Sequence, residues 1–275
     1  MKSTVKEQTI HLTDYDSCYN VFTKNSTRAS DLGLGSLFSR WLGSCLGCLD
    51  NEQWATTRKI FKPLFDVNYN CIDGIISQWN ETLHQDYITA FDKNTPVSIQ
   101  QLSKKLPLDC IVHIVFGKLR EDESLKPLFS ELAECAEMLM LDMFHNDDTR
   151  KIMYRFRFWT ETNKRLNKFN KLWNRLMNCA ISRQNDTLIF KDIYTNYIKN
   201  KHLVSYNMFS QTLIEIIYAN QDVTTPSLEW LILHCAQYGN IFNDLEDSTD
   251  TDQMMNFINE SARFAPMVYQ HWHMD

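Results

Sequence analysis

The sequence predicts a mainly α-helical protein that is built around one long central helix. Apolar residues recur at intervals of three and four along most of the chain, which is the period of one helix face. Only 7 glycines and 6 prolines occur among 275 residues, and so few turn-forming residues argue against an all-β protein. The chain is 44% hydrophobic, which is enough for a sizeable core, and we expect residues 1–275 to form a single helical domain.

The helical pattern is interrupted at recognisable stops, which divide the chain into consecutive elements. Acidic residues after Asp50 suit the N-terminus of a helix, and Pro63 ends that helix. Between Asn25 and Asp50, serines, glycines and several apolar side chains predict a long loop of the kind that often covers a ligand cavity. The expected helices span residues 14–22, 50–63, 69–91, 97–117, 124–144, 148–182, 187–199, 205–239 and 253–264.

The helix expected over residues 205–239 combines apolar faces with a polar centre. Its apolar residues cover most of its circumference, so it belongs inside the domain. Its centre, residues 220–225, is polar and is followed at once by Pro226. Because a proline lacks the N–H that the carbonyl of Asp222 would accept, the helix is predicted to bend or open there. Buried polar groups are costly without partners, so this centre is either a satisfied kink or a functional site.

Composition and cysteine usage exclude several classes of function. The net charge of -6 gives no signal for nucleic-acid binding. No run of about eighteen apolar residues occurs and no signal peptide is visible, so we expect no spanning helix and a cytoplasmic chain with free thiols. A CxxC pattern, Cys45 to Cys48, can be redox-active or form half of a zinc site. Neither a second ligand pair nor a βαβ pattern accompanies it, so we interpret it as small residues lining the loop.

Three segments, in the right order, resemble motifs of the cytochromes P-450. Trp54-Ala-Thr-Thr-Arg58 resembles the WxxxR helix of that family, and Ala219-Asn-Gln-Asp222-Val-Thr224 resembles the AGxDTT segment of its central helix. Glu260-Ser-Ala-Arg263 resembles the ExxR motif. One such motif is weak, but three in order within a helical chain are fairly specific. The glycine-containing stretch before Trp54 and the DVTT-type centre look most like fungal secondary-metabolite members.

The resemblance implies the helical portion of the cytochrome P-450 fold around its central helix, with most of the β-sheet portion missing. The haem-binding loop of the family, FxxGxRxCxG, would follow the ExxR helix, but the sequence reaches Asp275 without it. The usual amino-terminal anchor and first sheet are not recognisable either. We therefore expect residues 1–275 to be a single, incomplete helical domain, truncated at both ends.

The same resemblance implies roles for individual residues around a haem cofactor. Trp54 and Arg58, four residues apart on one helix face, would contact a haem propionate, and Ala219 would lie against the cofactor. Glu260 and Arg263 would form a buried pair that steadies the scaffold on the haem side. No protein residue is assigned as a metal ligand.

Asp222 and Thr224 would be the catalytic residues, lying near bound O2 and relaying protons. Here the sequence departs from the family pattern, because Val223 stands where the family has its threonine. Thr224 is one residue further, about 100° around the helix. Asn220, in place of the usual glycine, would narrow the oxygen groove or supply a polar group of its own.

The activity that the resemblance implies is haem-dependent monooxygenation of an apolar small molecule. Electrons would come from NADPH through a reductase partner, and full-length relatives would work at the face of the endoplasmic reticulum membrane. The axial thiolate is central to this chemistry, and no cysteine is placed to supply it, so we expect this chain alone to be inactive.

Two other functions remain open. The chain could be a truncated, non-catalytic helical protein or pseudoenzyme that acts through partner binding. It could also be a terpene-cyclase-like enzyme, with acidic pairs at residues 244–247 and 250–252 holding Mg²⁺. Because these pairs lie in a polar loop, we favour a solvated acidic turn.

Overall fold

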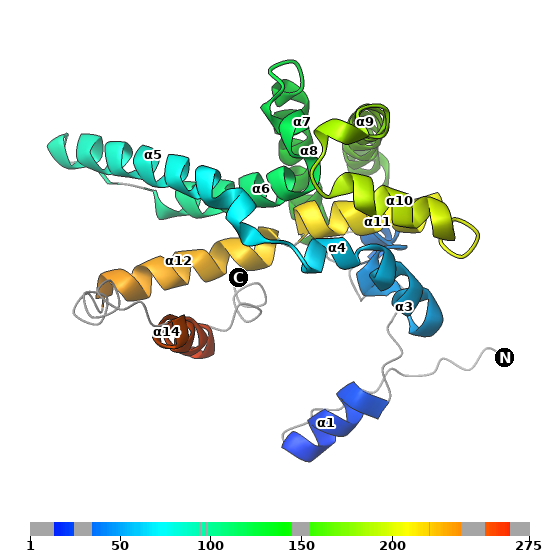
Figure 1. The fold of residues 1–275 in the computed structure, drawn as a ribbon, viewed down its shortest axis with the longest axis horizontal. Coiled ribbons are helices and arrows are strands. Elements are labelled where there is room, and N and C mark those ends of the chain that lie inside the picture. The colour runs from blue at the N-terminus through cyan, green and yellow to red at the C-terminus, as the bar shows by residue number, and fades with distance from the viewer. Residues whose placement is uncertain are drawn as a thin grey trace.

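The computed structural model confirms a mainly α-helical protein, with no strand in the described part of the chain (Figure 1). The structure describes residues 14–24, 35–93, 95–96, 98–144, 154–219, 221–237 and 251–264. None of the helices in these ranges is both long enough and apolar enough to cross a membrane. The elements are, in order, α1 (Tyr15–Lys24), α2 (Gly35–Trp41), η1 (Leu46–Cys48), α3 (Asn51–Ile60), α4 (Lys62–Phe65), η2 (Tyr69–Ile72), α5 (Asp73–Asp92), α6 (Ile99–Phe116), α7 (Lys118–Glu121), α8 (Lys126–Phe144), α9 (Tyr154–Ser182), η4 (Gln184–Asp186), α10 (Phe190–Asn200), α11 (Tyr206–Ile214), the π-helix η5 (Glu215–Ala219), α12 (Gln221–Gln237) and α14 (Thr251–Phe264).

Most buried side chains belong to α8, α9, α10 and α11, with α2 and α6 completing the core. Phe169 lies between two tryptophans, with ring centroids 5.4 Å from Trp41 and 6.3 Å from Trp173. The edge of Tyr218 meets the Phe169 ring at 5.8 Å. Trp173 Nε1 donates a hydrogen bond of 2.8 Å to Ser210 Oγ, whereas Trp41 Nε1 is buried without a hydrogen-bond partner among the described residues.

A charged pair inside the protein joins α8 to α9. Arg165 Nη1 donates to both carboxylate oxygens of Asp142, at 2.8 and 2.7 Å, and Thr162 Oγ1 lies 3.2 Å from one of them. Asp142 is buried, and these partners compensate its carboxylate for the water that burial removes. The two longest core helices are therefore held in one register by charge as well as by packing.

The long loop predicted over residues 25–50 is wrong where the structure describes it. Residues 35–48 contain α2 and η1, and the side chains of Leu37, Phe38, Trp41 and Leu42 are buried in the core. Gly35 is the first residue of α2 and Gly43 follows its last residue by two positions. These glycines therefore mark the two ends of a helix and do not belong to a flexible loop. Residues 25–34 lie outside the described part of the chain.

The single helix predicted over residues 205–239 is present as three consecutive helical segments. Its start is as expected, because the Ser205 side chain caps α11 by accepting the N–H of Met208 at 3.2 Å. The bend or opening predicted at Asp222 stays a prediction: helix α12 continues through Pro226, which still has no N–H to donate to the Asp222 carbonyl. A departure from α geometry that the sequence did not predict lies earlier, in the π-helix η5.

Contacts with the segment around η1 account for this earlier departure. The Glu215 carboxylate, at the first residue of the π-helix, accepts the N–H of Gly47 at 3.1 and 3.3 Å. One turn before it, Gln211 Oε1 accepts the N–H of Ser44 at 2.6 Å. The register change in the central helix is thus tied to a segment packed beside it, which fits the preference of π-turns for sites with tertiary constraints.

The second half of the central helix runs away from the core between two neighbours. Figure 1 shows α12 alongside α6, with α14 packed against its other side and α5 extending above α6. At the opposite end of the view, α3 lies with α4 against α10. This layout brings two of the elements that carry the sequence motifs together, α12 and α14, and places the third, α3, at the other end of the view.

Candidate functional site

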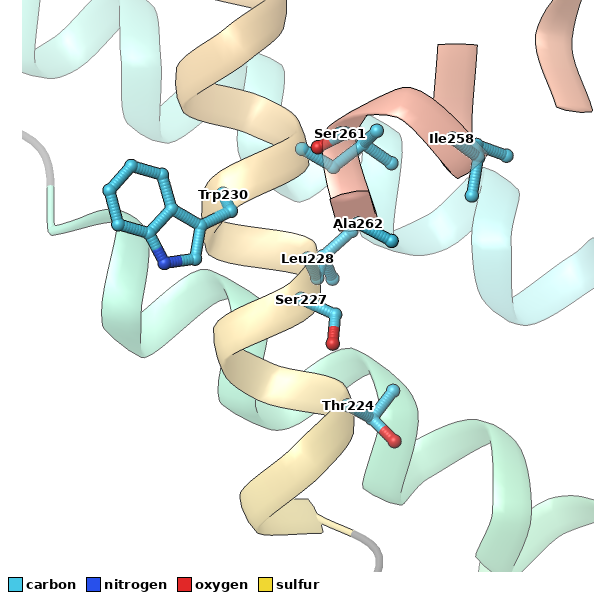
Figure 2. A pocket seen from close by; sticks show the side chains of 8 residues that line it. Thr224, Ser227, Leu228, Trp230, Ile258, Ser261 and Ala262 are labelled. Carbon is cyan, nitrogen blue, oxygen red and sulfur yellow. The ribbon is translucent and has the colours of Figure 1, made fainter. Parts of the chain in front are cut away.

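A pocket of about 220 Å³ lies between α12 and α14 (Figure 2). Its walls are mainly apolar, with a few hydroxyl groups among them, which is typical of sites for small organic ligands. The lining residues are Thr224, Ser227, Leu228, Trp230, Leu231, Ile258, Ser261 and Ala262.

Helical spacing brings the α12 side of this pocket together. Ser227, Leu228 and Leu231 follow Thr224 by three, four and seven residues, respectively. At these spacings all four side chains share one face of the helix. In Figure 2, Thr224 and Ser227 extend from the same side of α12, whereas the Trp230 ring extends to the other side. The α12 wall therefore presents the hydroxyl groups of Thr224 and Ser227 beside the aliphatic carbon of Leu228 and Leu231.

Helix α14 supplies the facing wall and is held to α12 by a polar contact. His234 Nδ1 lies 2.7 Å from Ser261 Oγ, and Ser261 is buried. The Trp230 ring centroid is 5.7 Å from that of His234. The histidine tautomer decides which of the two groups donates this hydrogen bond. With either tautomer, the bond holds Ser261 at the edge of the pocket.

The structure brings one predicted catalytic residue to this pocket. Thr224 lines it and is exposed to solvent. Asp222 stands in the first turn of α12, and its side chain lies outside what the structure describes. Ala219, predicted to lie against a cofactor, is half-buried at the end of the π-helix.

The predicted pair of Glu260 and Arg263 forms, but it is not buried. Arg263 Nε donates to Glu260 Oε2 at 2.8 Å, and the side chains of Arg263 and Glu260 are 65% and 60% exposed, respectively. Ser261 and Ala262, between them in sequence, are the residues that face the pocket. The motif thus places its charged members on the outer side of α14 and its small members inside.

Trp54 and Arg58, predicted to hold a propionate, lie away from this pocket on α3. Trp54 is 38% exposed. The Arg58 guanidinium stacks over the Phe65 ring, with its central carbon 3.3 Å from the ring centroid. Helix α3 packs against α10, α4 and η1, so these side chains do not meet Thr224.

Sequence reasoning missed Ser227, His234 and Ser261, although signals for them exist. Ser227 follows Thr224 by three residues, Ser261 lies inside the ExxR-like segment, and Trp230 precedes His234 by the spacing of one helix face. Within the described ranges, no three His, Cys, Asp or Glu side chains gather as a metal site. The acidic pairs at residues 244–247 fall outside those ranges.

Comparison with known proteins agrees with the motifs. The family model described as "Cytochrome P450" matches residues 3–270. The chain is 26% identical to the cytochrome P450 monooxygenase PUL2 of Kluyveromyces lactis, over 78% of this chain and 42% of that protein. It is 26% identical to asaD of Aspergillus flavus, over 76% of this chain and 41% of that protein. It is 24% identical to aclC of Aspergillus oryzae, over 88% and 52% respectively. The chain spans about half the length of the curated relatives it matches.

Proposed function

Since this chain belongs to the cytochrome P450 family, we propose that its function is part of haem-dependent monooxygenation, in which one oxygen atom of O2 enters an apolar small molecule. The relatives named above are fungal proteins described as monooxygenases, which supports this activity. By the same family relationship, electrons would pass from NADPH through a reductase partner, and a full-length protein would work at the endoplasmic reticulum membrane.

One observation of the structure supports this proposal most directly. Thr224, from the segment that resembles the oxygen-activating motif, lines the same apolar pocket as Ser261 and Ala262, from the ExxR-like segment. Residues 37 positions apart, and from two different family motifs, thus meet at one site. A mainly apolar pocket with a few hydroxyl groups suits an apolar substrate that must be oriented by a small number of polar contacts.

The described pocket does not fit a haem. Its volume of about 220 Å³ is below the roughly 300–1,000 Å³ of usual small-molecule sites. Trp54 and Arg58 lie on a different part of the molecule, and none of the described lining residues is a cysteine that could supply a thiolate. We therefore propose that this chain alone does not catalyse the reaction, and that a working site needs residues beyond those described.

Titration of the purified chain with haemin, followed by reduction under carbon monoxide, tests both parts of this proposal. We expect at most a weak Soret change, without the spectrum that marks thiolate ligation. A thiolate-type carbonyl spectrum would support the monooxygenase assignment but overturn the inactivity of the isolated chain. A complete absence of haem binding, even after mixing with a segment that carries the family's cysteine loop, would overturn a role in haem chemistry.

A second function is favoured by exposed apolar residues on α14. Met254 and Met255 are 38% and 48% exposed, respectively. Such residues suit a non-catalytic chain that binds a partner through this helix. Loss of partner capture in a variant with both replaced by serine, with haem binding absent throughout, would favour this function over the first.

A further inference from the structure

Cys45 and Cys48 form a close pair of thiols at the two ends of a single turn. Their Sγ atoms are 3.8 Å apart, and both cysteines are reduced. The N–H of Cys48 donates to the Cys45 carbonyl at 2.9 Å, so the backbone closes a tight turn between them. A turn of this kind brings the two Cα atoms within about 7 Å, which is compatible with the Cα separation of a disulfide. Side-chain rotation alone can bring the sulfurs to bonding distance.

The central helix holds this turn from outside. The Glu215 carboxylate accepts the Gly47 N–H between the two cysteines, and Gln211 accepts the Ser44 N–H just before them. A Cβ atom at position 47 would lie 2.4 Å from Glu215 Oε1, so only glycine allows the carboxylate this close. The thiol pair is therefore fixed against the first residue of the π-helix, and a change in the turn would reach that helix directly.

The two thiols differ in access. Cys45 is fully buried, whereas Cys48 is half-buried and is the one within reach of a solute. Because a dissolved disulfide must meet the attacking sulfur, Cys48 reacts first and Cys45 second. Burial, and next the negative charge of Glu215, raise the pKa of Cys45 well above its usual value, which slows the second step.

We propose that Cys45 and Cys48 are a reversible redox modification site, which closes to a disulfide by exchange with a low-molecular-weight disulfide such as oxidised glutathione. In the first step, the Cys48 thiolate attacks one sulfur of oxidised glutathione, the S–S bond of that molecule breaks, and one glutathione leaves as a thiolate that takes up the proton lost by Cys48. In the second step, Cys45 loses its proton and attacks the Cys48 sulfur, and the second glutathione leaves and takes up that proton. Two protein thiols are oxidised and one glutathione disulfide is reduced to two thiols. This site is independent of haem chemistry.

Mapping of the wild-type chain tests the proposal without any variant. The protein is equilibrated in buffers of graded reduced-to-oxidised glutathione ratio, quenched with acid, alkylated and digested with trypsin. The tryptic peptide of residues 41–58 contains both cysteines, because Arg40 and Arg58 bound it. At oxidising ratios we expect this peptide unalkylated and lighter by two hydrogen atoms, while the peptides with Cys135 and Cys179 remain alkylated. Double alkylation of peptide 41–58 at every ratio, or a lasting glutathione adduct on Cys48, would overturn the proposal.

Three variants test the order of events. In Cys45→Ser, we expect a lasting glutathione adduct on Cys48, since the second thiol is gone. In the matched control Cys179→Ser, which removes another half-buried thiol, closure should be unchanged. Glu215→Gln keeps an acceptor for Gly47 and removes the charge, so the pKa of Cys45 falls and closure at pH 7 should be severalfold faster than in the wild type. A Cys45→Ser chain without the adduct, or closure no faster in Glu215→Gln, would contradict the proposed sequence of steps.

Discussion

At Gly117 the chain leaves α6 with φ 52° and ψ -125°, a conformation that residues with a side chain rarely adopt. The same position is also crowded. A Cβ atom there would lie 2.9 Å from the backbone nitrogen of Leu188, where the segment before α10 crosses the end of α6. The N–H of Ile189 donates to the Ile114 carbonyl at 3.2 Å and fixes this crossing. Glycine is therefore required both by the backbone and by its neighbour.

Replacing this residue should destabilise the fold. We expect Gly117→Ala to lower the free energy of unfolding by about 1–3 kcal/mol, because the strained backbone and the contact with Leu188 cannot both be relieved. Gly74→Ala is the matched control, since Gly74 is exposed in the first turn of α5 and nothing lies within 4 Å of the added methyl group. Urea unfolding followed by circular dichroism measures both. Equal midpoints for the two variants would contradict the prediction.

The sequence could indicate which residues belong to a motif, but not what surrounds each of them. Thr224 lines the pocket, while its predicted role near bound O2 stays a prediction. Glu260 and Arg263 were predicted as a pair, and they pair, but the spacing of two charges on a helix does not determine which side of that helix is covered. The position of the Arg58 guanidinium is likewise set by a stacking contact with the ring of Phe65, which belongs to the following helix, α4.

Between elements, the main feature that the sequence did not predict is the π-helix within the central helix. Pro226 and the polar residues before it predict a bend or opening at Asp222, because proline removes a hydrogen bond whatever surrounds it. The π-helix lies earlier, at Glu215–Ala219, where Glu215 accepts the N–H of Gly47, 168 residues away in the chain. Periodicity within a window cannot reveal such a contact. The one local signal is that Glu215 is a carboxylate among apolar residues.

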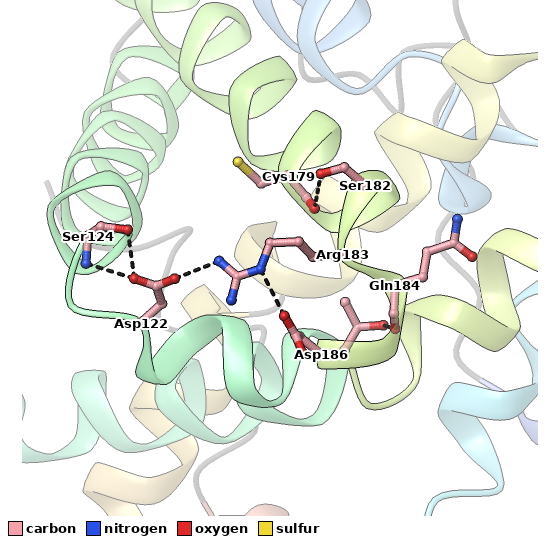
Figure 3. A network of polar contacts seen from close by, with 8 residues as sticks. Asp122, Ser124, Cys179, Ser182, Arg183, Gln184 and Asp186 are labelled. Carbon is pink, nitrogen blue, oxygen red and sulfur yellow. Dashed lines mark hydrogen bonds and ion pairs between the residues drawn. The ribbon is translucent and has the colours of Figure 1, made fainter.

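A network of ion pairs and hydrogen bonds around Arg183 joins two other elements, and we expect its strength to depend on pH (Figure 3). Arg183, after the end of α9, donates to Asp122 at 2.6 Å and to Asp186 at 2.8 Å, and Asp122 also accepts from the Ser124 N–H and hydroxyl. The hydrogen bond from Arg183, followed by those from Ser124, lowers the pKa of Asp122 from 3.8 to about 2. This carboxylate ties the turn before α8 to the end of α9.

Because the folded-state pKa of Asp122 is lowered, its stabilising effect is present above pH 3.8 and is lost as the pH falls through about 2. We expect Asp122→Asn to lower the thermal midpoint at pH 6, and we expect this difference from the wild type to shrink by pH 2.5. Asp92→Asn, at the exposed end of α5, controls for removal of a charge. A wild-type advantage over Asp122→Asn that stays constant with pH would show that the ionised pair is not responsible.

Over the whole molecule, the described helices divide into a dense core and a less protected side. The helical class and most helix positions could be predicted, because apolar period and chain composition are local properties. The placement of α2 in the core could not be predicted, because its partners in α8 and α9 are far away in sequence. No described side chain of α5 is buried, and Ser261 is the one buried side chain described in α14.

This division predicts a gradient of local stability. We expect amide hydrogen exchange to be slowest in α9 and α11, where large side chains such as Phe169, Trp173 and Phe209 are fully buried. Exchange in α5 and α14 should be faster by at least about tenfold, since these helices can open without breaking the core. Mass-resolved exchange on the native chain measures both groups in one sample. Protection of α14 equal to that of α11 would contradict the gradient.

The bonds from Ser44 to Gln211 and from Gly47 to Glu215 also have a consequence for synthesis on the ribosome. They join positions that are 167 and 168 residues apart, and the earlier partner of each emerges first. At roughly 5–20 residues per second, η1 waits on the order of ten seconds or more for these partners, and the apolar side chains of α2 wait on the order of ten seconds for α8 and α9 to cover them. During that interval, a nascent chain displays Phe38 and Trp41 to solvent, so it is a natural client for chaperones that bind short apolar segments.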